Sequence, residues 1–347
     1  MDRPVHTEGA PLPLLTPNFC FLFMAHFSFG FSFWPYVLLP VFLQGLGSTL
    51  SEVGIIMGAA SISGMIVRPW TGEALDRIGR RSCLLAGGLV FFITHIFYLF
   101  ITQIGPFIYV VRLFHGLSMG ILFATFFTFA ADITPEGRRT EGIALFGISG
   151  HFSGALGVPL GEFLIRTWGY PGLFKASAGF TLLFTFLCLF LKEPKKTGEK
   201  PGFRLIDFFR TGLQPANRIP LIGNGLFSLG LISYMVFLKP YAHEKGFTVT
   251  FFFLAYSLSA VFIRLIGGKW PDQFGLKTVL YPAFVSLASG IAVLALWPSP
   301  TALLISGVLC GMGHGFIFPI LSVVRIYRAT EHECGRRMAL FSMLLAV

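Results

Sequence analysis

The sequence predicts an all-α membrane protein made of two related halves, and three observations lead to this fold class. Hydrophobic residues make up 54% of the 347 residues and charged residues only 12%, against roughly 25% charged in soluble domains. Apolar runs of about 20 residues, the length that crosses a bilayer, occur about ten times. A charged pattern also occurs twice with identical internal spacing, which indicates an internal repeat. Its members are Arg68, Gly72, Asp76 and Gly79, and then Arg264, Gly268, Asp272 and Gly275.

The first half, residues 1–191, is expected to hold six spans. The apolar runs place them at about 17–43, 52–70, 83–102, 106–131, 142–165 and 173–191. Residues 192–218 form the longest polar segment and contain several lysines and arginines, so we expect a basic cytoplasmic linker there. Within it, 203–209 fits either a short amphipathic helix on an anionic membrane surface or a plain solvated linker.

The second half, residues 219–347, is expected to hold spans at about 219–241, 248–267, 278–297 and 302–327. The repeat aligns Gly137-Arg138-Arg139 with Gly335-Arg336-Arg337, after which only 338–347 follow. We therefore expect about ten full spans plus the start of an eleventh at 338, so that the second half is incomplete. A shortened protein, a disrupted reading frame and a partial record all fit this pattern.

The net charge of +10 is distributed over short loops between the apolar runs. Basic residues concentrate in alternate loops, which predicts a multi-pass protein of the plasma or inner membrane with a cytoplasmic N-terminus. Nucleic acid is not an expected partner. The five cysteines have no C-x-x-C spacing, so neither a disulfide framework nor a metal site is indicated. No phosphate-binding loop or nucleophile constellation is present, so we expect no cofactor and no enzyme activity.

The loop after the second span resembles the signature of the major facilitator superfamily of secondary transporters. The residues that carry the resemblance are Gly72, Asp76, Arg77, Gly79, Arg80 and Arg81, preceded by Arg68. The resemblance covers essentially the whole chain and implies two six-helix halves that rock around a central site. It also implies that the loop and its counterpart at Arg264 form a cytoplasmic gate. The alternative is that the loop charges only anchor the topology.

The fourth span resembles the Arg-x-x-Gln-Gly motif of proton-coupled members, with His115 in place of the glutamine after Arg112. His115-Gly116 recurs as His314-Gly315, so the two histidines are expected to face one cavity. Histidine titrates near neutrality, which suits proton coupling, although a packing role is the alternative. His95 is interpreted as packing. The proton-coupling candidates are Arg112, His115, His26, His151, His314 and Glu162.

The fifth span resembles the glycine- and proline-rich motif of antiporters. The matching residues are Gly150, Gly154, Gly157, Pro159 and Gly161. Val158 and Glu162 stand where that motif expects glycines, which weakens the assignment. A line of glycines in a membrane helix is otherwise a close-packing face.

These patterns predict a transporter that moves a small organic solute by alternating access, as a monomer in the lipid bilayer. The favoured function is efflux of amphipathic compounds coupled to protons. The alternatives are a metabolite or sugar symporter for uptake and a non-transporting, inactive membrane protein. By family analogy, spans one, four, seven and ten line the cavity. The candidate lining residues are Phe31, Trp34, Arg112, His115, Tyr234 and His314. Lys239 is expected to snorkel to the outer surface, with attraction of an anionic group as the alternative.

Overall fold

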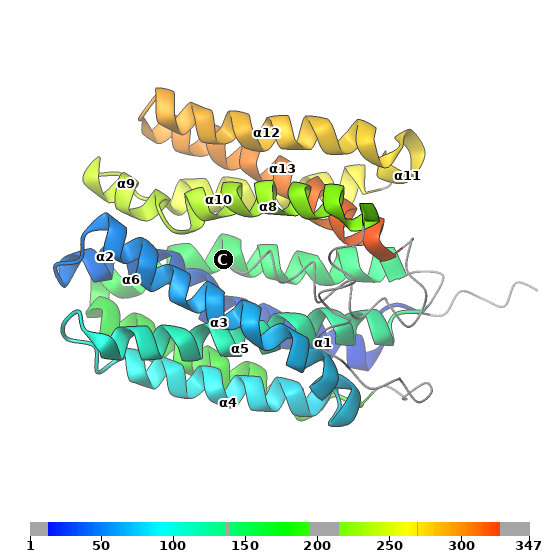
Figure 1. Cartoon of the computed structure of the whole chain (residues 1–347), viewed down its shortest axis with the longest axis horizontal. Helices are drawn as coiled ribbons and strands as arrows, with labels where there is room; N and C mark the ends of the chain where they lie inside the picture. The colour runs from blue at the N-terminus through cyan, green and yellow to red at the C-terminus, as the bar shows by residue number, and fades with distance from the viewer. Residues whose placement is uncertain (1–12, 136–138, 194–214, 269, 327–347) are drawn as a thin grey trace, which may run out of the picture.

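The computed structural model describes residues 13–135, 139–193, 215–268 and 270–326, and within these ranges the chain is helical and contains no strand. Most of the linker expected at 192–218 and the start of an eleventh span at 338 lie outside the described residues. Figure 1 shows two groups of roughly parallel and antiparallel helices, α1 to α6 below and α8 to α13 above. The described chain therefore forms two adjacent helical halves.

In the first half, α1 (Pro17–Phe33), the 3₁₀ segment η1 (Trp34–Leu38) and α2 (Leu39–Gly45) follow one another as one membrane-length run. Prolines at the start of η1 and of α2 lack the N–H that a continuous helix would use, which accounts for the interruptions. The next helices are α3 (Leu50–Arg77), α4 (Arg80–Tyr98) and α5 (Pro106–Ile133). Thr49 and Glu52 form a capping box that starts α3.

The charged stretch from Arg68 to Arg81 was expected to be a break between spans, and this expectation is wrong for most of it. Helix α3 continues to Arg77, and α4 begins at Arg80. The stretch contains good helix formers, and Arg77 forms an i,i+4 ion pair with Glu73 at 3.3 Å. Only Ile78 and Gly79 separate the two helices.

Helix α6 (Arg139–Cys188) covers the residues of the expected fifth and sixth spans. The helix is interrupted at Gly169, whose φ of +67° is a conformation that favours glycine. Among the described residues, nine helical runs are long and apolar enough to cross a membrane. Ten full spans were expected, and the difference arises because α6 joins two of them.

The second half contains α8 (Pro215–Met235), α9 (Leu238–Glu244), α10 (Thr250–Gly267), α11 (Trp270–Phe274), α12 (Leu276–Leu296) and α13 (Pro300–Ile326). The backbone conformation of two glycines shows the internal repeat. Gly79 precedes α4 with a φ of +92°, and Gly275 precedes α12 with a φ of +89°. The two repeated glycines therefore make the same left-handed entry into a helix.

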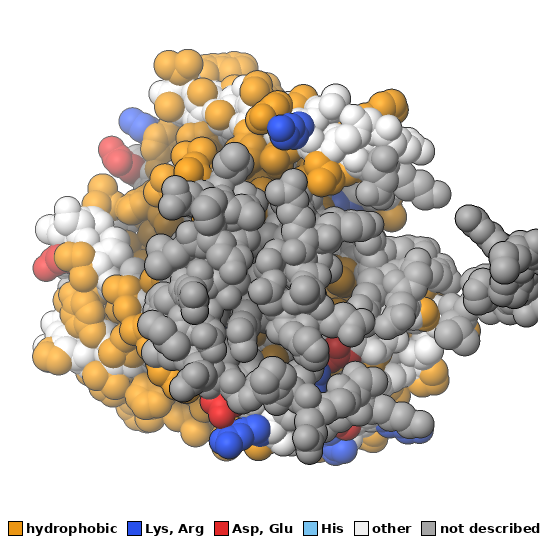
Figure 2. Space-filling view, turned by 45° about the vertical axis from the view of Figure 1, so that its right-hand side comes forward, with side chains coloured by type: hydrophobic (Ala, Val, Ile, Leu, Met, Phe, Trp, Pro, Cys, Tyr) orange, Lys and Arg blue, Asp and Glu red, His pale blue; other side chains and the backbone are white. Residues whose placement is uncertain are grey.

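Two hydrophobic clusters lie within the first half, and a third joins the halves. The third cluster combines Trp34 and Val158 with Phe227, Phe253 and Tyr256. Large apolar side chains also cover the outside of the described chain, as expected for a protein in contact with lipid, and charged side chains form separate small groups in Figure 2. The described part is therefore a membrane protein whose halves share an apolar interface.

Candidate functional site

Polar side chains from both halves meet between α6 of the first half and α8, α10 and α13 of the second. We call His151 on α6, Tyr234 on α8, Tyr256 and Arg264 on α10, and His314 on α13 the interhalf cluster. The His151 and His314 rings lie 5.1 Å apart between centroids at 86°. The Tyr256 hydroxyl shares a hydrogen bond with Nδ1 of His314 and accepts one from the Tyr234 hydroxyl at 3.4 Å. One histidine of the cluster therefore comes from each half.

Arg264 is the only arginine or lysine of the interhalf cluster. Its Nε donates to the carbonyl of Gly315 at 3.3 Å, and its Cζ lies 5.9 Å from the centroid of the Phe318 ring. A Cβ built on Gly147 of α6 would lie 2.8 Å from Nη1. The glycine thus leaves room for the guanidinium between α10 and the first half.

Trp34 forms one wall of the cluster from the first half. Its ring centroid lies 6.2 Å from those of Phe253 and Tyr256, and its Nε1 donates to the carbonyl of Gly150 at 2.8 Å. A Cβ built on Gly154 would lie 2.7 Å from the indole ring. The indole therefore fits against α6 only because a glycine is present there.

The other residues of the antiporter-like motif also face span one. A Cβ on Gly161 would lie 2.9 Å from the Leu38 side chain, and one on Gly150 would lie 3.2 Å from the His26 ring. Gly157 and Pro159 belong to the same stretch of α6. The glycines therefore act as a close-packing face, which was the alternative interpretation.

A second polar group lies inside the first half. Arg112 donates to the carbonyls of Ile56 and Met57 on α3 and to the hydroxyl of Tyr98 at 3.2 Å. That hydroxyl also shares a 3.2 Å hydrogen bond with Nδ1 of His115. Arg112 and His115 are both buried. This group joins α3, α4 and α5 to one another.

The structure does not bring His115 and His314 together. The neighbours of His115 are aromatic rings of η1 and α4, all in its own half. His26 is hydrogen-bonded to Ser149 at 2.7 Å and enclosed by phenylalanines, one layer behind His151. Phe31 stacks on Phe180 at 4.9 Å, in its own half. Trp34, Tyr234 and His314 are therefore the cavity candidates that share a neighbour, because each of them contacts Tyr256.

At the end of the bundle that carries the α2–α3 turn, Glu162 of the first half binds three side chains of the second. Its carboxylate accepts from Nζ of Lys239 at 2.5 Å, from the hydroxyl of Thr250 at 2.5 Å and from the hydroxyl of Thr248. Lys239 was expected to snorkel outward, but its side chain is only 15% exposed. We call these four residues the Glu162 latch.

The opposite end, with the α3–α4 turn, holds the gating motif. The Glu193 carboxylate accepts from the backbone N–H groups of Arg80 at 2.6 Å and Arg81 at 2.9 Å, at the start of α4. Anions bind well at this position because the first N–H groups of a helix lack helical partners. Arg80 Nε also pairs with Asp132 at 2.8 Å. The motif is thus tied to the ends of α5 and α6.

The role of the charged motif as a cytoplasmic gate stays a prediction, because the structure describes only part of the motif. The side chains of Asp76 and Asp272 lie outside the described residues. Arg68 is buried in α3, and its Nε and Nη1 have no hydrogen-bond partner in the described part of the chain. Gly72 and Gly268 lie at the same ends of α3 and α10 as the arginines that precede them.

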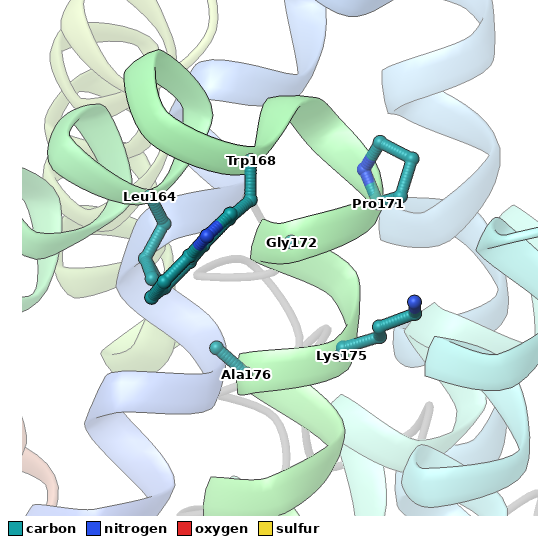
Figure 3. Close-up of a pocket in the computed structure, with 6 residues that line it drawn as sticks. All are labelled: Leu164, Trp168, Pro171, Gly172, Lys175 and Ala176. Carbon is teal, nitrogen blue, oxygen red and sulfur yellow. The ribbon is translucent and has the colours of Figure 1, made fainter.

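A separate pocket of about 560 Å³ lies on α6 beside the break at Gly169. Figure 3 shows Trp168 and Leu164 next to each other on its wall, with Lys175 directed away from them. All of its lining residues belong to α6, and Trp168 is 63% exposed. The pocket is therefore a surface feature, remote from the interhalf cluster.

Sequence reasoning missed Tyr256, Glu193, Thr248 and Thr250 as site residues. Tyr256 lies eight residues before Arg264 in one helix, a spacing that puts both near one face, and this signal was available. Glu193 follows a long apolar run, which gave no indication of its distant contact. The two threonines border the α9–α10 turn and gave no signal before Glu162 was placed.

Comparisons with known proteins extend these observations. A family model described as Major Facilitator Superfamily matches residues 19–347. The quinolone resistance protein NorA of Staphylococcus aureus (strain MSSA476) is 24% identical over 235 residues, which is 67% of this chain and 58% of NorA. The matched part therefore spans little more than half of that relative.

Solved structures share the fold at lower identity. The human organic anion transporter MFSD10 (TETRAN) has a TM-score of 0.74 at 18% identity, covering 95% of this chain and 91% of that one. A D-xylose-proton symporter has a TM-score of 0.71 at 15% identity, covering 94% and 86%. Because the family model matches nearly the whole sequence, this chain belongs to the Major Facilitator Superfamily, whose members are transporters and not enzymes.

Proposed function

We propose that this protein is a proton-coupled exporter of amphipathic organic solutes that works by alternating access. The observation that carries the proposal is the interhalf cluster, where polar and aromatic groups of both halves meet, together with the Glu162 latch, which joins the halves at one end of the bundle. A site between two halves that is closed on one side is what alternating access requires. The similarity to NorA, named for quinolone resistance, favours efflux.

In the proposed orientation, the end with the α3–α4 turn faces the cytoplasm. The basic loops support this orientation and a cytoplasmic N-terminus. The Glu162 latch then closes the outer side, and the gating motif around Arg80 lies on the inner side. We propose that the protein acts as a monomer in the plasma or inner membrane, with a gate that opens and closes as the halves rock.

Proton coupling is assigned to His151 and His314. Their rings lie 5.1 Å apart across the boundary of the halves, so a change in the charge of either one alters the interaction between the halves. Glu162, the remaining carboxylate candidate in a span, is assigned to the latch because a lysine and two threonines already bind it. Arg112 and His115 are assigned to bracing α3, α4 and α5, and His26 to packing between α1 and α6.

Uptake by symport is the second candidate, favoured by the likeness to a D-xylose-proton symporter. The direction in which the solute moves relative to the proton gradient distinguishes export from uptake. Everted vesicles from cells that express the chain are given an acid-inside gradient and a fluorescent quinolone. We expect the quinolone to accumulate inside and to leave when an ionophore collapses the gradient. Gradient-driven loss of preloaded quinolone would overturn export in favour of uptake. If vesicles that lack the protein accumulate the same amount of quinolone, the protein does not transport it, and the alternative of an inactive membrane protein is favoured.

A further inference from the structure

Arg264 is a cation in a membrane-length helix, and no described carboxylate forms an ion pair with it. Among the described residues, the ion pairs are Arg77 with Glu73, Arg80 with Asp132 and Lys239 with Glu162. The hydrogen bond of Arg264 to Gly315 uses only its Nε. A guanidinium has four further N–H donors on its two terminal nitrogens, and no described residue accepts from them.

Two histidines lie close to this cation. The Phe318 ring stacks on His314 at 5.9 Å between centroids and also lies beneath the Arg264 guanidinium, so the two basic groups are neighbours. On the facing helix, Gly147 borders the guanidinium one turn before His151. Nδ1 of His151 is buried and has no partner in the described chain. Arg264, His314 and His151 therefore lie close together. The terminal guanidinium nitrogens of Arg264 and Nδ1 of His151 have no hydrogen-bond partner among the described residues.

No described carboxylate balances them. Of the α6 carboxylates whose side chains the structure describes, the nearest is Glu162, eleven residues and about 16 Å along the helix from His151. That carboxylate already accepts hydrogen bonds from Lys239, Thr248 and Thr250. A charge in the interior of a membrane protein is costly unless something compensates it. Among the described side chains, the interhalf cluster thus holds no anion that compensates the charge of Arg264.

Aromatic side chains surround the basic groups. Trp34, Phe227 and Phe253 are buried in the apolar cluster that joins the halves, and the ring centroid of Phe227 lies 5.0 Å from that of His314. These aromatic side chains do not stabilise a small hydrated ion, because it has no apolar surface to bury. They stabilise an organic ion, because its apolar part is removed from water when it packs against them. The site combines an anion-binding head with an apolar wall.

We propose that the interhalf cluster selects amphipathic organic anions, with Arg264 binding the carboxylate or equivalent anionic group of the solute. This inference rests on the proposed function, because it names the substrate class of the transport site. The terminal guanidinium nitrogens bind the anion in a bidentate manner, and His151 supplies a further donor. The aromatic walls hold the apolar body. Neutral and cationic compounds of the same shape bind more weakly.

The test compares three probes with one apolar body and different charges. Naphthalene-1-acetate, its primary amide and 2-(1-naphthyl)ethylammonium are titrated into the purified full chain, and binding is measured by isothermal titration calorimetry. We expect the carboxylate to bind about tenfold more tightly than the amide, and the ammonium to bind most weakly. Equal affinities for the three probes would overturn the inference. So would a failure of the carboxylate to bind.

Variants assign the preference to Arg264. In Arg264→Gln, the affinity for the carboxylate is expected to fall to that of the amide, while the affinity for the amide stays the same. Arg264→Lys keeps the charge and part of the preference. The unchanged amide affinity shows that the site is still folded. Arg166→Gln removes an exposed charge from the first half and keeps the full preference. A preference for the carboxylate that survives Arg264→Gln would contradict the assignment.

A competition arm separates an organic anion from a simple one. Sodium acetate and sodium chloride are titrated against bound naphthalene-1-acetate, and both are expected to compete far more weakly than the amphipathic probe. Competition by acetate at equal affinity would overturn the role of the aromatic wall. Binding is measured without transport, so vesicles that fail to move any probe count against the proposed function alone. Transport of all three probes without binding preference counts against this inference alone.

Discussion

The histidine of the fourth span is enclosed by its own half, whereas its counterpart in the tenth span meets the opposite half. His115 contacts rings of η1 and α4, while His314 contacts His151 of α6. The accompanying arginines differ in the same way. Arg112 binds backbone carbonyls within the first half, and Arg264 borders Gly147 across the boundary. An internal repeat can thus keep its helices and still assign the same residue type to bracing in one half and to the site in the other.

The largest expected effect concerns the two glycines that follow the repeated histidines, each of which lies at a close helix crossing of its half. A Cβ on Gly116 would lie 1.8 Å from the backbone oxygen of Ala60, whereas a Cβ on Gly315 would lie 2.2 Å from a side-chain carbon of Ile263. A side chain can rotate away and a backbone cannot. We expect Gly116→Ala to lower the free energy of unfolding by about 3 kcal/mol or more and Gly315→Ala by about 1. Thermal unfolding in detergent measures both, and an equal loss would break the comparison.

The tyrosines that bind the two histidines provide the next test. Tyr98→Phe removes a buried hydroxyl that binds both Arg112 and His115. It should cost about 1–3 kcal/mol of stability and leave the affinity for naphthalene-1-acetate unchanged. Tyr256→Phe should weaken that affinity several-fold with a smaller loss of stability, because it frees His314 within the site. The reverse pattern, with Tyr98 controlling affinity, would assign the site to the first half.

The smallest effect is expected for ion pairs. Glu162 and Lys239 connect the halves with side chains 11% and 15% exposed, whereas Glu73 and Arg77 pair on the surface of one helix. A double-mutant cycle of Glu162→Gln and Lys239→Met should give a coupling of roughly 1 kcal/mol, against roughly 0.3 for Glu73→Gln and Arg77→Met. Unfolding measurements provide both values. A coupling in the latch no larger than that of the surface pair would show that the latch does not stabilise the closed outer side.

The sequence was sufficient for the elements and the family, but not for the direction of side chains. The apolar run expected at 248–267 corresponds to α10 at Thr250–Gly267, because length and hydropathy in a membrane are fixed by the bilayer. The loop motif identified the superfamily. The sequence did not show that the His115 side chain lies inside the first half and not at the boundary between the halves. Its direction depends on how α5 packs against α3 through Gly116. The contact of Glu193 with α4 joins residues more than a hundred positions apart, and no local pattern indicates such a contact.

The contacts of Trp34 affect how the two halves can move against each other. Its indole is hydrogen-bonded to Gly150 of its own half and touches Phe253 and Tyr256 of the other half only through ring contacts. Ring contacts of this kind contribute roughly 0.5–1.5 kcal/mol each and are favourable in both offset-stacked and edge-to-face arrangements. When the halves rock, the indole therefore travels with α6, and the boundary shears along aromatic faces without breaking a hydrogen bond. For the proposed alternating-access cycle, we therefore expect a low barrier to rocking at Trp34 and a rate of opening that depends on the Glu162 latch.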